Sequence, residues 1–389
     1  MESAAPRSPL RLVLVLGSTQ TLAWASSYYL PAILAEPMAR ELGLEHAWVF
    51  AAFSAALLVS AVFGPAVGRR IDARGGRGML ACSSGVFAAG LVLLATAQGV
   101  WGMALAWLVT GVAMGMGLYD AAFATLTRQL GLRARSAITG VTLMGGFAST
   151  LGWPLTAWLE GAWGWRSACL VWAAVHLLVA LPLHALLVPA PPAQEAAAVG
   201  AGGATRPASP LLLGLLAYVF AAGWFVSTAM AAHLPRLLEM AGSAPGVAVA
   251  AAALVGPAQV LARLFEFSLL GRFHPLVSAA LAASLHPLGA VLFVLGGAPA
   301  AAFALLHGAG NGLLTIAAGT LPLVLFGASG YGRRQGWLTA PARALQAVAP
   351  LLFAVLLEQL GSSVLVVSSA LLLGALVAVG CIAWQLRQR

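Results

Sequence analysis

The sequence contains no lysine, and charged residues of all kinds make up only 8% of its 389 residues. Soluble domains have about 25% charged residues, so this composition excludes an ordinary soluble fold. The lack of lysine also excludes the glycine–lysine phosphate loop of nucleotide hydrolases. Hydrophobic residues account for 61% of the chain. We therefore predict an integral membrane protein that crosses the lipid bilayer many times and has no ATP site.

Cysteine is also scarce. Cys82, Cys169 and Cys381 lie far apart in apolar segments, with neither metal-ligand spacing nor a disulfide framework. No combination of nucleophile and base is visible either. We predict that the protein is not an enzyme and has no metal site and no cofactor.

The formal net charge of +9 comes entirely from arginine. These arginines do not form one basic face, as nucleic-acid binding would require. They fall mostly in short segments between apolar stretches, which is the pattern of the positive-inside rule. We therefore predict lipid and a small molecule as partners, and no nucleic acid.

A helix needs about 20 apolar residues to cross a bilayer. Segmenting the chain at this length predicts twelve transmembrane helices. The predicted spans are 11–35, 47–67, 78–97, 101–127, 136–159, 166–188, 211–234, 246–270, 275–295, 299–326, 337–360 and 362–385.

The stretch "PAPPAQEAAAVGAGGATRPAS" separates the first six spans from the last six. Its composition, rich in proline, alanine and glycine, is typical of a flexible linker. We predict two six-helix halves, 1–188 and 211–389, joined by a cytoplasmic linker at 189–210. Six spans on each side are the arrangement expected from an internal duplication.

Arginine counting predicts the orientation. With a cytoplasmic N-terminus, most arginines fall on the cytoplasmic side, and only Arg40, Arg166 and Arg236 fall opposite. We predict a multi-pass monomer of the bacterial inner membrane with both termini cytoplasmic. Two further arginines, Arg263 and Arg343, fall inside predicted spans.

The second and third spans are joined by a loop with the sequence "GRRIDARGGR". Gly68 permits close helix contact, Asp72 can pair with arginines or cap a neighbouring helix, and Gly75 permits a tight turn. A generic positive-inside turn explains the arginines but not the glycine–acid–glycine spacing.

This loop resembles the signature loop of the major facilitator superfamily. The resemblance implies an all-α fold of twelve transmembrane helices in two pseudo-symmetric halves, and secondary transport by alternating access. It also implies a conformational latch formed by Gly68, Asp72, Arg74, Gly75 and Arg77.

Arg263 lies eight residues before Gly271, where the cytoplasmic turn begins. At about 1.5 Å per residue it reaches roughly 12 Å into the bilayer, close to the midplane. Gln259 and Glu266 share its helical face. A charge at this depth is costly and is usually functional. Arg263 either binds an anionic substrate in a bidentate fork or pairs structurally with Asp120 or Glu266, and both roles can coexist.

The helix around Arg263 is also similar to that of monocarboxylate and oxalate–formate type transporters, in which an intramembrane arginine binds a carboxylate. Gln259 stands where the monocarboxylate group has an aspartate. In "YYLPA", Ala32 stands where that group has a lysine. The resemblance implies an anionic substrate, whereas the two departures leave the coupling mechanism open.

Asp120 lies eight residues before Arg128, at a depth similar to that of Arg263. It is the strongest candidate for proton coupling, with a purely structural pair as the alternative. His307 and His233 are weaker candidates, and His176 and His184 are assigned no role.

The remaining predicted substrate-binding residues are polar or aromatic groups in helices expected to line a central cavity. With Arg263, the predicted set is Gln259, Gln20, Trp24, Tyr28, Tyr29, Trp224, Asn311, Arg343 and Gln346. The sequence thus predicts a secondary active transporter of a small organic anion, with proton coupling as an option. The alternative is a proton-coupled exporter of drugs or amphiphilic cations that uses Asp120.

Overall fold

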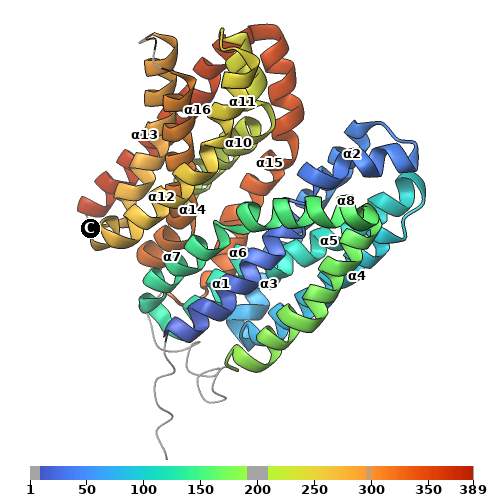
Figure 1. Ribbon diagram of the computed structural model, residues 1–389. Coiled ribbons are helices and arrows are strands. Elements are labelled where there is room, and N and C mark those ends of the chain that lie inside the picture. Colours follow the sequence, from blue (N-terminus) through green and yellow to red (C-terminus); the bar gives the residue numbers. More distant parts are fainter. Residues whose placement is uncertain (1–8, 191–208, 296, 298, 389) are drawn as a thin grey trace, which may run out of the picture. The chain divides into compact units, whose positions relative to one another are not determined.

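The computed structural model describes residues 9–190, 209–295, 297 and 299–388. Nearly all of the predicted linker at 189–210 lies outside these residues. Throughout the described chain the regular secondary structure is helical (Figure 1). The predicted all-α class is therefore confirmed.

The chain forms two compact units. The first comprises Met1–Thr205 and Leu325–Trp337, and the second comprises Arg206–Val324 and Leu338–Arg389. A short segment from late in the sequence thus belongs to the first unit. The division into sequence halves at 189–210 stays a prediction.

The first unit contains the helices of the N-terminal part of the chain. They are α1 (Pro9–Ala25), α2 (Pro31–Leu42), α3 (His46–Arg74), α4 (Arg77–Ala95), α5 (Gly99–Gly117), α6 (Tyr119–Leu130), α7 (Ala134–Gly145) and α8 (Ala148–Val175). Two π-helical turns, His176–Ala180 and Leu183–Leu187, continue α8.

The remaining helices lie in the second unit, except that α14 ends and α15 begins in the first. They are α10 (Pro210–Met240), α11 (Pro245–Ala253), α12 (Val255–Ser268), α13 (Pro275–Val294), α14 (Ala300–Phe326), α15 (Tyr331–Leu360) and α16 (Val364–Arg387).

Several predicted spans are interrupted rather than continuous. The span 101–127 breaks at Leu118, whose ψ of −169° is extended, and α6 starts at the next residue. The span 246–270 breaks between α11 and α12, shortly before Pro257. Proline has no N–H and clashes with the carbonyl four residues earlier, so the helix cannot continue through 253 undisturbed. Broken helices of this kind occur in transporters where backbone groups or polar side chains are needed.

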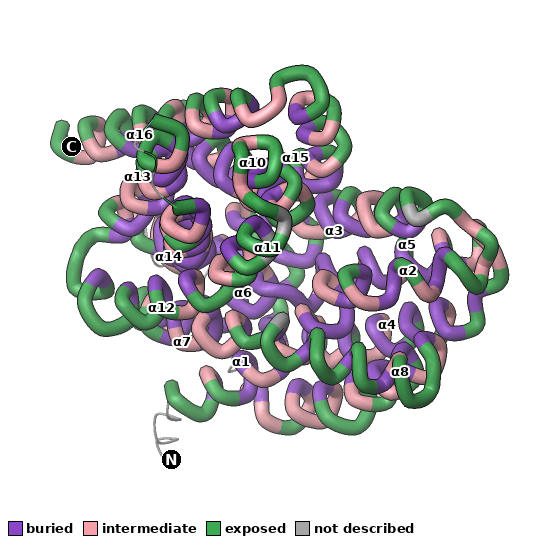
Figure 2. The backbone as a smooth tube through the Cα atoms, turned by 45° about the horizontal axis from the view of Figure 1, so that its top comes forward, coloured by how far each residue is buried: buried purple, intermediate pink, exposed green. Residues whose placement is uncertain are grey.

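Eight helical stretches of the described chain are long and apolar enough to cross a membrane. Two of them, Gly99–Leu187 and Tyr331–Arg387, are long runs of 89 and 57 residues that contain consecutive helices. The first predicted span is not among the eight, because α1 has only 17 residues. Apolar side chains also lie on the outside, with Val62 76% and Leu178 77% exposed. Figure 2 shows exposed residues recurring along α8 and α16. An apolar exterior suits lipid rather than water.

The interior of each unit is aromatic and aliphatic. In the first unit, Trp107, Phe87 and Phe123 are almost completely buried. In the second unit, Phe303 and Phe353 belong to one continuous cluster of buried residues. Close-packed interiors of this kind hold polar side chains in fixed positions.

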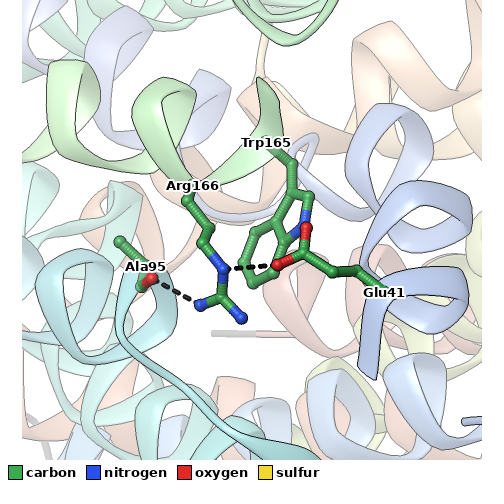
Figure 3. A network of polar contacts seen from close by, with 4 residues as sticks. All are labelled: Glu41, Ala95, Trp165 and Arg166. Carbon is green, nitrogen blue, oxygen red and sulfur yellow. Dashed lines mark hydrogen bonds and ion pairs between the residues drawn. The ribbon is translucent and has the colours of Figure 1, made fainter. Parts of the chain in front are cut away.

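A polar network ties α2 to the part of α8 that follows a kink at Gly164 (Figure 3). Arg166 donates from Nε to Glu41 Oε1 at 2.7 Å and from Nη1 to the carbonyl of Ala95 at 2.6 Å. Trp165 donates from Nε1 to Glu41 Oε2 at 2.6 Å. The hydrogen bonds from Arg166 and then from Trp165 lower the pKa of Glu41. The network thus joins α2, α4 and α8, with Glu41 outside the predicted spans and Ala95 and Arg166 at the ends of the predicted spans 78–97 and 166–188.

Candidate functional site

The second unit holds Arg263 on α12. The side chain is 5% exposed. Its Nη2 donates to Gln259 Oε1 and to Thr315 Oγ1, both at 3.4 Å. These distances are at the long end for hydrogen bonds, and both acceptors are neutral. The guanidinium is thus in reach of weak acceptors that an anionic ligand would outcompete.

Two glycines of α14 bring this helix against α12. A Cβ at Gly312 would lie 2.6 Å from the carbonyl oxygen of Gln259. A Cβ at Gly308 would lie 2.6 Å from the carbonyl oxygen of Val255. The two helices can approach this closely only because both positions are glycine. The approach places Thr315, four residues after Asn311 on α14, beside Arg263.

Polar contacts continue from Thr315 into the unit. Thr315 Oγ1 donates to the carbonyl of Asn311 at 3.1 Å, and Ser227 of α10 donates to Asn311 Oδ1 at 2.8 Å. Separately, Gln346 of α15 donates to Thr228 Oγ1 at 3.3 Å. Three of the predicted site residues, Arg263, Gln259 and Asn311, are therefore brought together through Thr315, which the sequence analysis missed.

Glu266 lies one turn beyond Arg263 and is 1% exposed. Ser278 of α13 donates to Glu266 Oε2 at 2.5 Å. This hydrogen bond ties α12 to α13 and gives the carboxyl group a structural partner. Of the other predicted residues in this unit, Trp224 and Arg343 are half-buried on α10 and α15.

Three of the four aromatic residues predicted for the site, Trp24, Tyr28 and Tyr29, gather in the first unit. Trp24 lies 5.1 Å from Tyr28 and 4.9 Å from Tyr119, measured between ring centroids. Tyr29 contacts Trp24 and, at 5.7 Å, Trp153. Such tilted and edge-to-face pairs stabilise a rigid aromatic wall. Tyr119 was missed because it belongs to a helix start that the sequence pattern does not reveal.

Gln20 lies one helical turn before Trp24 on α1 and is completely buried. Its Nε2 donates to the carbonyl of Gly117 at 2.6 Å. Gly117 is the last residue of α5, so Gln20 satisfies one of the carbonyls that the helix end leaves without a partner. The contact gives Gln20 a structural task at the break between α5 and α6.

Asp120 lies in the first turn of α6, directly after that break. An acidic side chain at a helix N-terminus is stabilised by the helix dipole. Asp120 Oδ1 accepts a hydrogen bond from Gln335 Nε2 at 3.3 Å. Gln335 is 1% exposed, and the sequence analysis missed it. Asp120 and Arg263 belong to different units, so their pairing stays a prediction.

The end of α3, where the sequence suggested a loop, meets the start of α15 within the first unit, and Asp72 lies in the last turn of α3. Asp72 accepts hydrogen bonds from the backbone N–H of Gly332 at Oδ1 and of Arg333 at Oδ2, both at 2.8 Å. Of the two contacts offered by the sequence, pairing or capping, the structure thus contains the cap. Gly75 has a φ of +78°, which glycine adopts without strain.

The same contact is lined by glycine on both sides. A Cβ on Gly68 would collide with the carbonyl of Gly332, and a Cβ on Gly336 would lie 2.7 Å from the carbonyl of Gly64. Each helix therefore contributes two glycines four residues apart, the spacing that permits close helix approach. The spacing is visible in the sequence, but the pairing of the two helices is not. Arg74 is exposed and Arg77 half-buried at the loop.

No group of three histidine, cysteine or acidic side chains that could hold a metal ion occurs in the residues that the structure describes. The acidic and basic groups of the site are thus not gathered into a metal-binding cluster among these residues. Such groups are suited to binding and releasing a charged solute or a proton rather than to covalent chemistry.

Solved structures similar to this chain are membrane transporters. The proton:xylose symporter XylE, bound to 6-bromo-6-deoxy-D-glucose, matches with a TM-score of 0.74 and 12% identity over 97% of this chain and 95% of that chain. The transporter FucP, in the outward conformation, matches with a TM-score of 0.72 and 13% identity over 97% and 99%. The human organic anion transporter MFSD10 (TETRAN) matches with a TM-score of 0.67 and 18% identity over 96% and 100%. At these identities the likeness shows the fold.

A comparison with curated proteins gives no match. The family model of the Major Facilitator Superfamily matches residues 16–305. This range covers most of the chain and includes both the Asp72 loop and the Arg263 helix. The chain therefore belongs to the Major Facilitator Superfamily and is a multi-pass membrane transporter.

Proposed function

We propose that the protein transports a small organic anion and that Arg263 receives its carboxylate or similar oxyanion. The proposal rests on one observation: a buried guanidinium whose Nη2 reaches two neutral acceptors at 3.4 Å. An oxyanion forms shorter, charge-assisted and bidentate hydrogen bonds with arginine. A ligand of this kind would therefore replace Gln259 and Thr315 as the hydrogen-bond acceptor of Arg263, and the exchange would be favourable.

Neighbouring groups fit the same proposal. Gln259 and Thr315 supply a donor and a hydroxyl beside the guanidinium, and Asn311 extends the polar surface along α14. MFSD10 is an organic anion transporter with the same fold. Gln20, Trp24, Tyr28, Tyr29, Trp224, Arg343 and Gln346 remain predicted contributors to substrate binding.

The cap on α15 supports a latch at the Asp72 loop. Alternating access requires that some contacts form in one state and break in another. The two hydrogen bonds from backbone N–H groups to Asp72 and the contact between glycines can be broken without leaving a large side chain unpacked. Asp72 and Gly68 are thus suited to hold the start of α15 during one part of the transport cycle, with Gly75 shaping the turn and Arg74 and Arg77 beside it.

The proposed membrane arrangement follows the arginine pattern. Both termini are cytoplasmic, the membrane is the bacterial inner membrane, and the transporter works as a monomer. Asp120 is the proposed acceptor of a coupling proton in the first unit.

The alternative substrate is an amphiphilic cation. The observation in its favour is the aromatic wall of Trp24, Tyr28 and Tyr119, whose last member directly precedes Asp120. Aromatic faces and a carboxylate attract an organic cation. In this alternative, Asp120 binds the cation or exchanges it for a proton.

One binding experiment separates the two substrates. The purified protein is titrated with a panel of carboxylates, sulfonates and cationic dyes, and the shift in unfolding temperature reports binding. We expect anions to stabilise the wild type and Arg263→Ala to weaken their binding about 30-fold or more, the usual loss when a buried charge loses its partner.

Arg272→Ala is the matched control, since Arg272 is an exposed arginine just after α12. It should bind anions as the wild type does. Unchanged anion affinity in Arg263→Ala would assign Arg263 to a structural role. Dye binding that is lost in Asp120→Asn, without anion binding in the wild type, would establish the cation alternative.

A further inference from the structure

Two histidines of the second unit face each other inside the helix bundle. His286 of α13 is 1% exposed and His307 of α14 is 5% exposed. Their Nδ1 atoms lie 3.0 Å apart, and His286 Nε2 lies 2.9 Å from Ser368 Oγ on α16. The consecutive helices α13 and α14 are thus joined to α16, which lies further along the chain, by one chain of hydrogen bonds.

The contacts of this chain determine where its protons are. Ser368 has one hydroxyl proton, and its Oγ donates to the carbonyl of Leu365 at 3.2 Å. Ser368 therefore accepts from His286 Nε2–H, and a neutral His286 then has a bare Nδ1. His307 must donate from Nδ1–H to His286, which leaves the lone pair of its own Nε2. This is the arrangement of neutral imidazoles that satisfies all three contacts.

A cavity adjoins the pair. It is lined by both histidines, by Ser227 and Asn311, and by small or apolar residues of α10, α13, α14 and α16. The space open to the centre of a water molecule is about 20 Å³, enough for about one water but too small for an organic substrate. His307 Nε2 has no hydrogen-bond partner among the described residues. It is also not completely buried, unlike the enclosed unpaired atoms elsewhere in these residues. The bare nitrogen therefore borders the cavity.

The charges around the pair are few. The cavity lining on all four helices contains no acidic residue and no arginine, so the two imidazoles are its titratable groups. The ring of Phe303 lies 5.2 Å from His286 and 6.2 Å from His307. An aromatic ring within about 6 Å of a cation attracts it weakly. Phe303 is therefore a favourable neighbour for a protonated pair, in a lining that contains no carboxylate.

We propose that the His286–His307 pair is a binding site for a single proton. A hydronium ion that reaches the cavity transfers its proton to His307 Nε2, so that an N–H bond forms, an O–H bond breaks, and a neutral water remains. The Nδ1–H of His307 continues to donate to His286, and the chain to Ser368 stays intact. A second proton, on His286 Nδ1, would place two N–H groups against each other at 3.0 Å. The pair therefore holds one proton, not two.

The site is connected to Arg263 along a single helix face. His307, Asn311 and Thr315 follow at intervals of four on α14. Asn311 lines the cavity, its carbonyl accepts from Thr315, and Thr315 accepts from Arg263. A positive charge on His307 thus acts on the helix that presents Thr315 to Arg263. This link to transport rests on the proposed anion function, whereas the proton site itself does not.

The test is a titration of the full-length protein in lipid nanodiscs, with ¹⁵N-labelled histidine followed by NMR. Imidazole nitrogens report the tautomer and the protonation state of each ring. We expect one protonation step shared by two coupled rings, and its loss in His307→Gln. His176→Gln, in the first unit, should leave that step unchanged. Each variant is first compared with the wild type in thermal unfolding.

A wild-type spectrum in which both rings stay neutral, or in which both become fully protonated while the protein is folded, would overturn the proposal. Because the wild type alone gives this answer, it does not depend on the folding of a variant. Ser368→Ala is a second probe, since it removes the acceptor that fixes the tautomer of His286. It should shift the nitrogen resonances of both rings, and a shift confined to His286 would show that the pair is not coupled.

Proton release or uptake on anion binding then tests the link to Arg263. A pH indicator in weakly buffered solution should report a proton change in the wild type that is smaller in His307→Gln, and any proton change that remains there belongs to another acceptor such as Asp120. A wild type that binds the anion without a proton change would disprove the link. Failure of every anion to bind would count against the proposed function, while the NMR titration would still decide the proton site.

Discussion

The two units use buried histidines in different ways. In the first unit, His176 Nε2 lies 2.7 Å from Ser26 Oγ, and His184 lies 2.9 Å from both Ser84 and Thr19. His184 thus has a hydroxyl beside each ring nitrogen, whereas His176 has one, and its Nδ1 is enclosed without a hydrogen-bond partner. In the second unit, His286 and His307 face each other beside a cavity.

The difference teaches what a buried imidazole needs in order to function. A ring with a hydroxyl beside each nitrogen, as in His184, has no nitrogen that faces a cavity with a free lone pair for an incoming proton. A ring that shares one proton with its neighbour, and whose other nitrogen borders a cavity, has such a lone pair. Residue type is the same in both units, but the partners separate a structural tie from a proposed proton site.

The largest expected effect on stability is that of His184→Leu. The change removes two hydrogen bonds that tie the π-helical turn Leu183–Leu187 to α1 and α4. Each hydrogen bond contributes about 1 kcal/mol. We expect the free energy of unfolding to fall by about 2 kcal/mol, measured by denaturant or thermal unfolding in detergent. His184→Gln keeps a hydrogen-bonding amide and should recover part of the loss. A His184→Leu variant as stable as the wild type would remove the contrast between the units.

Asp72→Asn should have an intermediate effect, at the segment where α15 begins in the first unit. An amide keeps one acceptor oxygen but loses the charge that favours a helix N-terminus. A lost cap costs about 1 kcal/mol, which corresponds to roughly fivefold faster hydrogen exchange at the amides of 332–337. Uptake should change more than substrate affinity does. If Asp72→Asn raised the hydrogen-exchange rate equally throughout α15, Asp72 would not stabilise the start of that helix in particular.

The smallest effect is expected for Glu41→Gln, because the Glu41–Arg166 pair is partly exposed. The side chains are 50% and 32% exposed, so the contribution to stability is below about 1 kcal/mol. The lowered pKa of Glu41 means that its contribution is present above the ordinary carboxyl pKa and is lost as pH falls through the lowered value. Wild type and variant should therefore differ in unfolding temperature near neutral pH and converge in acid. A difference that persists in acid would point to packing of the side chain rather than to its charge.

Much of the fold follows from the sequence because it depends on local properties. Apolar runs of spanning length, arginine-rich turns and the Asp72 loop are all readable along the chain. The helix breaks at Leu118 and before Pro257 are harder to predict from the sequence. Leucine is not a helix-breaking residue, so nothing at position 118 marks a break. Asp120 therefore appeared to be a mid-helix residue, whereas it lies at a helix start.

The site could be predicted only in part. Arg263 is conspicuous because a charge in an apolar helix is rare. Thr315 and Gln335 are ordinary polar residues, and nothing along the chain indicates that they reach Arg263 and Asp120. The histidine pair is likewise created by packing, since His286 and His307 lie on different helices with a turn between them. Long-range contacts of this kind depend on which helix faces meet, and composition does not encode that choice.

The contact between Gly68 and Gly332 has a consequence for how the protein can vary. Because backbone meets backbone there, any replacement of Gly68 adds a Cβ where the Gly332 carbonyl lies. The contact can be lost by every substitution and improved by none, so it admits no gradual adjustment. Substitutions that adjust the rate of the transport cycle are therefore expected at neighbouring positions. Asp72 is one of them, because a different side chain there would weaken its two hydrogen bonds without a steric clash.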